Sequence, residues 1–209
     1  MECWNCQAET HGAPFCPACG KIGARAPGAT WFDVFGLTPT VDVDAAALDA
    51  KFRELSLKLH PDRFATADAR ERRLSLEQTS ALNTAYQTLK DPAKRVAYLL
   101  SLHGVDLDAD QGEGRVTMAP EFLMEIMELR EALDGARQRR DLDAALRMAE
   151  EVKRRKAAAL DEAMAALRTL LSNPDAGEAK RTAAQALGQS RYFARFLQEV
   201  EAMEEEALA

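Results

Sequence analysis

The chain has 209 residues, a net charge of −7, and 47% hydrophobic and 29% charged residues, the balance of an ordinary globular protein. The whole negative excess lies in residues 104–209, which argues against general nucleic-acid binding. No apolar run approaches the ~20 residues that a membrane helix needs, and no signal peptide opens the chain. We therefore expect a cytoplasmic protein without membrane or nucleic-acid partners. Alanine, leucine, glutamate and arginine dominate, which favours an all-α fold.

All four cysteines lie in the first 19 residues, as the two pairs Cys3-Trp-Asn-Cys6 and Cys16-Pro-Ala-Cys19. Four thiolates in two such pairs are typical of a tetrahedral zinc site with no open position. We predict one structural Zn²⁺ per chain, held in a small zinc-knuckle segment over residues 1–25, with metal binding as its folding energy. A single iron ion also suits this spacing. Two disulfides are improbable without an export signal. Residues 21–30 are rich in Gly, Ala and Pro, so we expect a short linker there.

Residues 31–103 predict a helical hairpin preceded by an aromatic turn and followed by a short helix. Gly36 should close the turn of residues 31–37. Apolar residues at three- and four-residue steps then predict a helix from an Asp44 N-cap to about His60. A second helix should cover about 68–89, and a third 93–102. On one face the first long helix should carry Leu48, Phe52, Leu55 and Leu59, and the second Leu74, Leu82, Ala85, Tyr86 and Leu89.

The tripeptide His60-Pro61-Asp62 should lie between the two long helices. Pro61 has no amide hydrogen and disfavours helical geometry at His60, so the first helix ends there. An imidazole and a carboxylate should then project outward from a rigid turn. Lys51, Lys58 and Arg63 add positive charge, which favours an acidic protein partner. The alternatives are that Pro61 merely stops a helix and that the basic residues merely face solvent.

Residues 104–118 are acidic and contain glycine, which predicts a linker. Helices should follow over about 120–134, 141–171 and 175–206, because Asp134-Gly135 and Ser172-Asn173-Pro174 interrupt the pattern. Three helices with short connections predict an antiparallel three-helix bundle. The first of them should place Phe122, Ile126, Leu129 and Leu133 in the core.

The same helix predicts an exposed apolar patch. Leu123, Met124 and Met127 lie away from the core stripe and beside charged residues, which is typical of a partner-binding surface. Tyr192 lies at the edge of the apolar face of the last helix. Both a core position and a contact position suit Tyr192.

Two amphipathic helices around His60-Pro61-Asp62 resemble the J domain, which stimulates ATP hydrolysis by DnaK-type chaperones. The segments WFDVFGL, HPDRF, LNTAYQTLKDPAKRVAYLL and FLMEIMELREAL together resemble the HscB-type J-domain co-chaperones of iron–sulfur cluster assembly. The resemblance covers residues 31–209. The cysteine pairs resemble an N-terminal extension that some members carry.

The resemblance implies a J domain at 31–103, a bundle at 119–209 that binds client, and no enzymatic activity of its own. The partners it implies are a DnaK/HscA-type chaperone and an IscU-like iron–sulfur scaffold protein. Chaperone contacts would be His60, Pro61, Asp62, Lys51, Lys58 and Arg63. Scaffold contacts would be Leu123, Met124, Met127, Glu128, Glu131 and Tyr192. The alternatives are a J protein for another client and a zinc-ribbon adaptor that binds nucleic acid.

Overall fold

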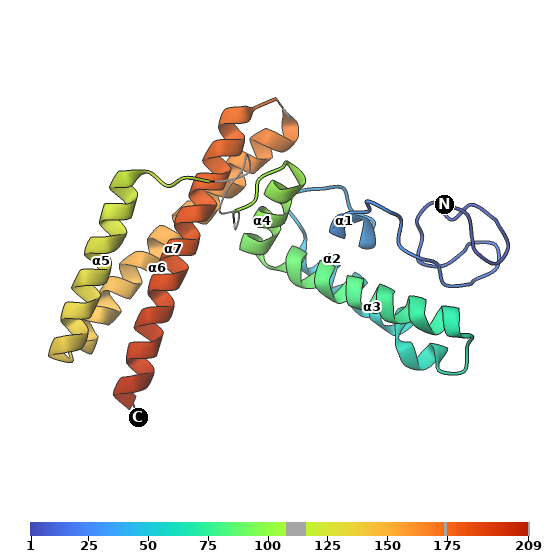
Figure 1. The fold of residues 1–209 in the computed structure, drawn as a ribbon, viewed down its shortest axis with the longest axis horizontal. Helices are drawn as coiled ribbons and strands as arrows, with labels where there is room; N and C mark the ends of the chain where they lie inside the picture. The colour runs from blue at the N-terminus through green and yellow to red at the C-terminus, as the bar shows by residue number, and fades with distance from the viewer. Residues whose placement is uncertain (108–115, 174, 209) are drawn as a thin grey trace. The chain divides into compact units, whose positions relative to one another are not determined.

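The structure is a computed structural model that describes residues 1–107, 116–173 and 175–208. These residues form only helices and turns apart from isolated bridges, which confirms the predicted all-α class (Figure 1). No helix in these ranges is long and apolar enough to cross a membrane. The elements are α1 (Trp31–Val34), α2 (Ala45–Leu59), the 3₁₀ turn η1 (Pro61–Phe64), α3 (Ala69–Lys90), α4 (Pro92–Leu102), α5 (Pro120–Arg139), α6 (Leu142–Ser172) and α7 (Gly177–Leu208).

The chain divides into two compact units, Met1–Arg95 and Val96–Ala209. Their boundary falls inside α4, ahead of the linker that we predicted at 104–118. Residues 108–115 of that linker lie outside the described residues. The domain limits 31–103 and 119–209 therefore stay a prediction.

In the first unit, α2 and α3 form an antiparallel hairpin, with α1 packed on α3. The apolar stripes on the two long helices face each other, and Leu82, Ala85 and Leu89 are fully buried. Asp44 caps α2 by accepting hydrogen bonds from the amides of Ala46 and Ala47, as predicted. This cap satisfies two of the free backbone amides in the first turn of α2.

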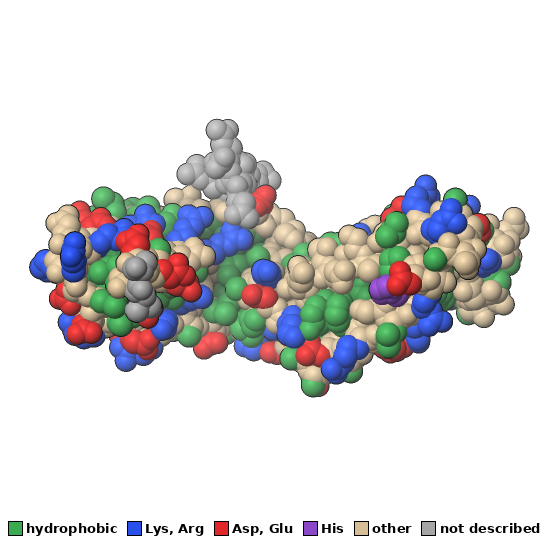
Figure 2. All heavy atoms as spheres, turned by 90° about the horizontal axis from the view of Figure 1, so that it is seen from below, with side chains coloured by type: hydrophobic (Ala, Val, Ile, Leu, Met, Phe, Trp, Pro, Cys, Tyr) green, Lys and Arg blue, Asp and Glu red, His purple; other side chains and the backbone are tan. Residues whose placement is uncertain are grey.

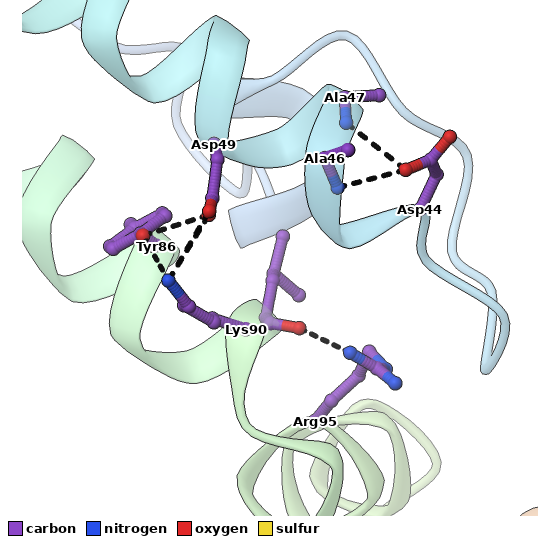
Figure 3. A network of polar contacts seen from close by, with 8 residues as sticks. Asp44, Ala46, Ala47, Asp49, Tyr86, Lys90 and Arg95 are labelled. Atoms are coloured by element: carbon purple, nitrogen blue, oxygen red, sulfur yellow. Dashed lines mark hydrogen bonds and ion pairs between the residues drawn. The ribbon is translucent and has the colours of Figure 1, made fainter.

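Tyr86, expected only as an apolar core residue, is the centre of a polar contact between α2 and α3 (Figure 3). Its ring stacks on Phe52 at a centroid distance of 3.9 Å, and its hydroxyl donates to Asp49 at 2.8 Å. Lys90 Nζ donates to the same hydroxyl at 2.7 Å. The hydrogen bond from Tyr86, and then one from Lys90 Nζ to Asp49 Oδ2 at 3.4 Å, hold the pKa of the Asp49 carboxyl below its usual value. In the same view, the Arg95 guanidinium donates to the Leu89 carbonyl near the end of α3.

The second unit contains the predicted antiparallel three-helix bundle. Helices α6 and α7 form a long hairpin, and α5 lies against part of both. Arg130 pairs with Glu199 at 2.9 Å and Arg137 with Glu206 at 3.8 Å, so both partners advance by seven residues. This shared step means that α5 and α7 run parallel and α6 runs against them. The expected core residues Phe122, Ile126 and Leu133 are buried, and Leu129 packs half-buried against them.

The predicted end of the first bundle helix at Asp134-Gly135 is wrong, because α5 continues to Arg139. A glycine inside a helix costs only about 1 kcal/mol relative to alanine. Ala136 is completely buried one residue later, and its burial favours the extra turn. The helix stops where Arg140 takes a left-handed conformation (φ 55°).

Candidate functional site

The four cysteine sulfurs converge as predicted. Sγ of Cys3 lies 3.6 Å from Sγ of Cys19, and Sγ of Cys6 lies 3.6 Å from that of Cys16. All four sulfurs lie within 4.8 Å of one another. Metal–sulfur bonds of ~2.3 Å in a tetrahedron require an edge of about 3.8 Å, so the four sulfurs fit one metal ion. A cluster of several irons would spread its cysteines over different metal atoms and would need wider separations.

The two cysteine loops form an internal repeat of thirteen residues. In each loop the first cysteine accepts a hydrogen bond from the residue four positions later and donates one to the residue five positions later. The residue after the second cysteine takes a left-handed conformation in both loops. Glycine adopts this conformation freely, whereas glutamine is strained in it. The paired bonds are Gln7 N to Cys3 O, Gly20 N to Cys16 O, Cys3 N to Ala8 O and Cys16 N to Lys21 O, each at 2.8–2.9 Å.

Backbone hydrogen bonds favour the thiolate form at Cys3 and Cys19, whereas at Cys6 a backbone hydrogen bond at Ala8 is outweighed by the contact with the Cys19 sulfur, burial and the other sulfurs, which raise the pKa to about 12. A hydrogen bond from the Lys21 backbone amide lowers the pKa of Cys19 to about 6. Backbone amides of Cys6 and Asn5 lower the pKa of Cys3. The four residues therefore fit a structural metal ion in geometry, and two of them also in their lowered pKa.

The expected linker from Lys21 onward is wrong at its start, because Lys21 to Gly23 pack on α3. Ile22 is completely buried. Lys21 Nζ lies 2.7 Å from Glu71 Oε2, and the Glu71 side chain is only 9% exposed. Gln78 Nε2 donates to the Gly23 carbonyl at 2.7 Å. The tetracysteine segment (residues 1–25) is therefore docked on the hairpin.

His60, Pro61 and Asp62, here called the HPD turn, lie between α2 and α3 as predicted. His60 ends α2 with an extended backbone, and Pro61 starts η1. The Asp62 amide donates to His60 Nδ1 at 3.3 Å, and Asp62 Oδ2 lies 3.5 Å from the same nitrogen. The side chains are 56% and 90% exposed. The imidazole and the carboxylate thus stand together at the surface.

Two α3 residues that the sequence analysis missed hold this turn. The hydroxyls of Ser75 and Thr79 donate to the Leu59 carbonyl at 2.6 and 3.1 Å. Leu59 directly precedes His60, so α3 fixes the backbone from which the turn starts. A signal was present, because Ser75 is a polar residue on the buried face of α3, next to Leu74.

The predicted basic strip is weaker than its sequence suggests. Lys51 and Lys58 both pair with Glu54, at 3.0 and 2.6 Å. Hydrogen bonds from Lys58 and, to a smaller extent, from Lys51 lower the pKa of the Glu54 carboxyl. Arg63 makes no ion pair with any described residue. Net positive charge beside the turn therefore comes mainly from Arg63 and from the one lysine charge that Glu54 leaves unbalanced.

The apolar patch on α5 is exposed where the sequence placed it. Met127 is 62% exposed, Met124 57% and Leu123 37%. Glu128 and Glu131 are exposed beside them, and neither makes an ion pair within the described part of the chain. We call these five residues the α5 patch.

Tyr192 lies half-buried on α7, between the two interpretations that the sequence left open. Its ring meets Phe122 edge-on at a centroid distance of 5.7 Å, and it packs against the bundle core. Phe122 directly precedes Leu123 of the α5 patch. The structure therefore places Tyr192 in the core margin, with a contact role as a prediction.

Two family models match the chain: the DnaJ domain over residues 30–98 and the HSCB C-terminal oligomerisation domain over 118–201. A co-chaperone protein HscB homolog of Burkholderia multivorans is 41% identical over 169 residues, or 81% of this chain and 90% of the relative. A homolog of Aliivibrio fischeri strain MJ11 is 39% identical over 178 residues, which cover 85% of this chain and 98% of the relative.

Solved structures agree. Human co-chaperone protein HscB superposes with a TM-score of 0.82 at 26% identity, covering 98% of both chains. Chaperone HscB from Vibrio cholerae gives 0.69 at 33% identity, covering 86% of this chain and 99% of that one. With a DnaJ match, an HscB C-terminal match and relatives aligned over nearly their full length, the chain belongs to the HscB family of co-chaperones.

Proposed function

We propose that this protein is a co-chaperone of iron–sulfur cluster assembly that stimulates a DnaK/HscA-type ATPase and delivers an IscU-like scaffold to it. The HPD turn would engage the chaperone, and the α5 patch would hold the scaffold. The observation that carries the proposal is that both surfaces are exposed on otherwise well-packed helices, in separate compact units. Bridging two partners requires such independent surfaces.

The chaperone-binding role of the HPD turn is supported by its rigidity and exposure. Pro61 restricts the backbone, and Ser75 and Thr79 hold the residue before the turn. His60 and Asp62 support no core, so their exposed groups are available to a partner. Arg63 and the partly balanced Lys51 and Lys58 would steer an acidic chaperone surface.

The scaffold-binding role of the α5 patch is supported by its composition. Leu123, Met124 and Met127 offer apolar side chains that adapt to a partner's shape. Glu128 and Glu131 border them with carboxylates that pair with no residue in the described ranges, which suits a partner with basic residues at its rim. Tyr192 would contribute indirectly, by supporting Phe122 behind the patch.

In this proposal the protein contributes binding and positioning, and ATP hydrolysis takes place in the chaperone. The tetracysteine segment would hold one zinc ion, for which Cys3, Cys6, Cys16 and Cys19 supply four thiolates. Zinc there would have a structural role, because four protein ligands leave no position for substrate.

The test is chaperone ATPase turnover, measured with this protein alone and together with the scaffold. His60→Ala and Asp62→Ala should abolish stimulation and keep the parent's circular dichroism spectrum. Thr66→Ala, an exposed polar residue just beyond η1, is the matched control and should behave as the parent. Full stimulation by either turn variant would contradict the chaperone-binding role. Stimulation without synergy from the scaffold would instead indicate a J protein for another client.

The surroundings of Trp4, the aromatic residue between the first two cysteines, argue against the nucleic-acid alternative. Arg70 covers a face of Trp4 at 4.6 Å from the ring centroid, and the indole N–H is bonded to the Ile22 carbonyl. Stacking on a base would require Trp4 to leave both partners.

A further inference from the structure

We propose that the tetracysteine segment is a metal-dependent clamp on α3, and that through α3 it holds the HPD turn in place. The role assigned to the turn rests on the proposed function. The coupling between metal and helix is a separate physical claim that can be measured without any partner.

The first step leads from the metal ligands to the contact residues. Lys21 follows the last cysteine pair, and its carbonyl accepts a hydrogen bond from the amide of Cys16. Trp4 lies between Cys3 and Cys6, and its indole donates to the Ile22 carbonyl at 2.7 Å. The metal ion thus fixes both loops, and the loops fix Lys21, Ile22 and Trp4. A segment this short has little other folding energy, so loss of the metal should release these residues.

The second step leads from the segment to α3. Three α3 residues contact it: Arg70 lies over Trp4 and Glu71 pairs with Lys21 in the first turn of α3, and two turns later Gln78 bonds the Gly23 carbonyl. Glu71 and Gln78 are only 7% and 8% exposed. These contacts cover the N-terminal half of α3. Because helices in proteins depend mainly on tertiary packing, that half should fray when the segment unfolds.

The third step leads from α3 to the HPD turn. Ser75, which with Thr79 holds the Leu59 carbonyl, lies between Glu71 and Gln78 on α3, and Thr79 directly follows Gln78. Fraying of residues 70–79 would loosen both hydrogen bonds and free the residue before His60. The metal ion and the turn are therefore joined by a continuous series of contacts, each of which can be broken singly.

The competing view is that the segment only rests on a hairpin that is stable by itself. Leu82, Ala85 and Leu89, which lie beyond the contacts with the segment, are completely buried and would keep α3 on α2. In that case, removing the metal would unfold residues 1–25 and leave α3 unchanged. The two views predict different behaviour of residues 70–79 after metal removal, so amide exchange in this stretch distinguishes them.

The experiment is hydrogen–deuterium exchange of the full chain, zinc-loaded and after treatment with a zinc chelator under reducing conditions. The clamp predicts that exchange in residues 70–79 and 56–62 accelerates at least threefold after chelation. Residues 159–170 of α6, in the other compact unit, serve as the internal control and should not change. Unchanged exchange in 70–79, with residues 1–25 fully exchanged, would overturn the proposal.

A variant separates the contact from the metal. Lys21→Met keeps the four cysteines and should bind one zinc ion, but it removes the partner of Glu71. It should accelerate exchange in residues 70–79 without chelation, whereas Lys94→Met, at an exposed lysine of α4, should not. Equal exchange in both variants would contradict the role of the Lys21–Glu71 contact.

Stimulation of the chaperone ATPase tests whether the clamp affects function. Chelation and Lys21→Met should each raise the concentration needed for half-maximal ATPase stimulation, by at least threefold. Accelerated exchange with an unchanged half-maximal concentration would refute the link from α3 to the turn. If even the zinc-loaded parent fails to stimulate the chaperone, the proposed function fails, and exchange alone decides the clamp.

Discussion

Two neighbouring residues of α5 should respond to alanine in opposite ways. Met127→Ala should weaken scaffold binding and leave the bundle stable, whereas Ile126→Ala should destabilise the bundle. The residues share a helix, a similar size and an apolar side chain, and they differ in exposure, 62% for Met127 against 3% for Ile126. The comparison therefore isolates the direction in which each side chain points.

The structure gives the size of each effect. Truncating a buried isoleucine to alanine costs about 2–5 kcal/mol, which lowers the melting temperature of a domain of this size by about 10 °C or more. Full burial of a methionine side chain contributes about 1.5–3 kcal/mol, and less than half of Met127 is covered, so its truncation should cost under about 1 kcal/mol. At an interface, loss of an apolar anchor costs about 2 kcal/mol, or about 30-fold in affinity. Leu123→Ala combined with Met127→Ala should weaken binding further.

Thermal unfolding by circular dichroism and calorimetric titration with the scaffold measure both quantities on the same preparations. ATPase stimulation without scaffold is the control for the HPD turn and should match the parent in each folded variant. If Met127→Ala melts as low as Ile126→Ala and binds the scaffold like the parent, Met127 is a core residue. The α5 patch would then have no role in client binding.

Three other perturbations follow from individual side chains. Gln7→Gly should relieve a left-handed glutamine, strengthening zinc retention against a competing chelator by up to about 1 kcal/mol, or about fivefold. Tyr86→Phe should destabilise the hairpin at pH 7, and the difference from the parent should shrink below about pH 4 in urea titrations. The sign follows because Asp49 has a lowered folded-state pKa, so its stabilising effect exists above the unfolded-state pKa and is lost as the carboxyl protonates. Dilute hydrogen peroxide should oxidise Met124 and Met127 before buried Met203, by peptide mass spectrometry, because sulfoxide formation follows exposure.

The sequence predicted the helices well where local chemistry determines their ends. Asp44 caps α2, and the helix ends at Leu59 with His60 as C-cap, directly before Pro61, as expected. The end of α5, which we predicted wrongly at Asp134-Gly135, is determined by contacts with other helices and not by local chemistry. The extra turn of α5 depends on the burial of Ala136 by other helices, and its end depends on a left-handed Arg140, which no residue preference signals.

The metal ligands could be predicted because all four lie in one short segment, where spacing alone brings them together. Docking of that segment could not, because Lys21 and Glu71 are fifty residues apart. The sequence could have predicted that Glu54 partly neutralises the basic strip. Glu54 lies three and four residues from Lys51 and Lys58 on one helix, the spacing at which opposite charges pair.

Helix α3 carries the sequence signal that periodicity alone passes over. Its buried face includes Glu71, Ser75 and Gln78, spaced by four and three residues among leucines and alanines. Burying a polar side chain is unfavourable unless a partner satisfies it, so each of these residues requires a specific contact. Each has one: Lys21, the Leu59 carbonyl and the Gly23 carbonyl. Two of the three partners belong to the tetracysteine segment and the third to the start of the HPD turn. Polar residues on the apolar face of α3 thus mark the points where metal segment and turn attach to the hairpin.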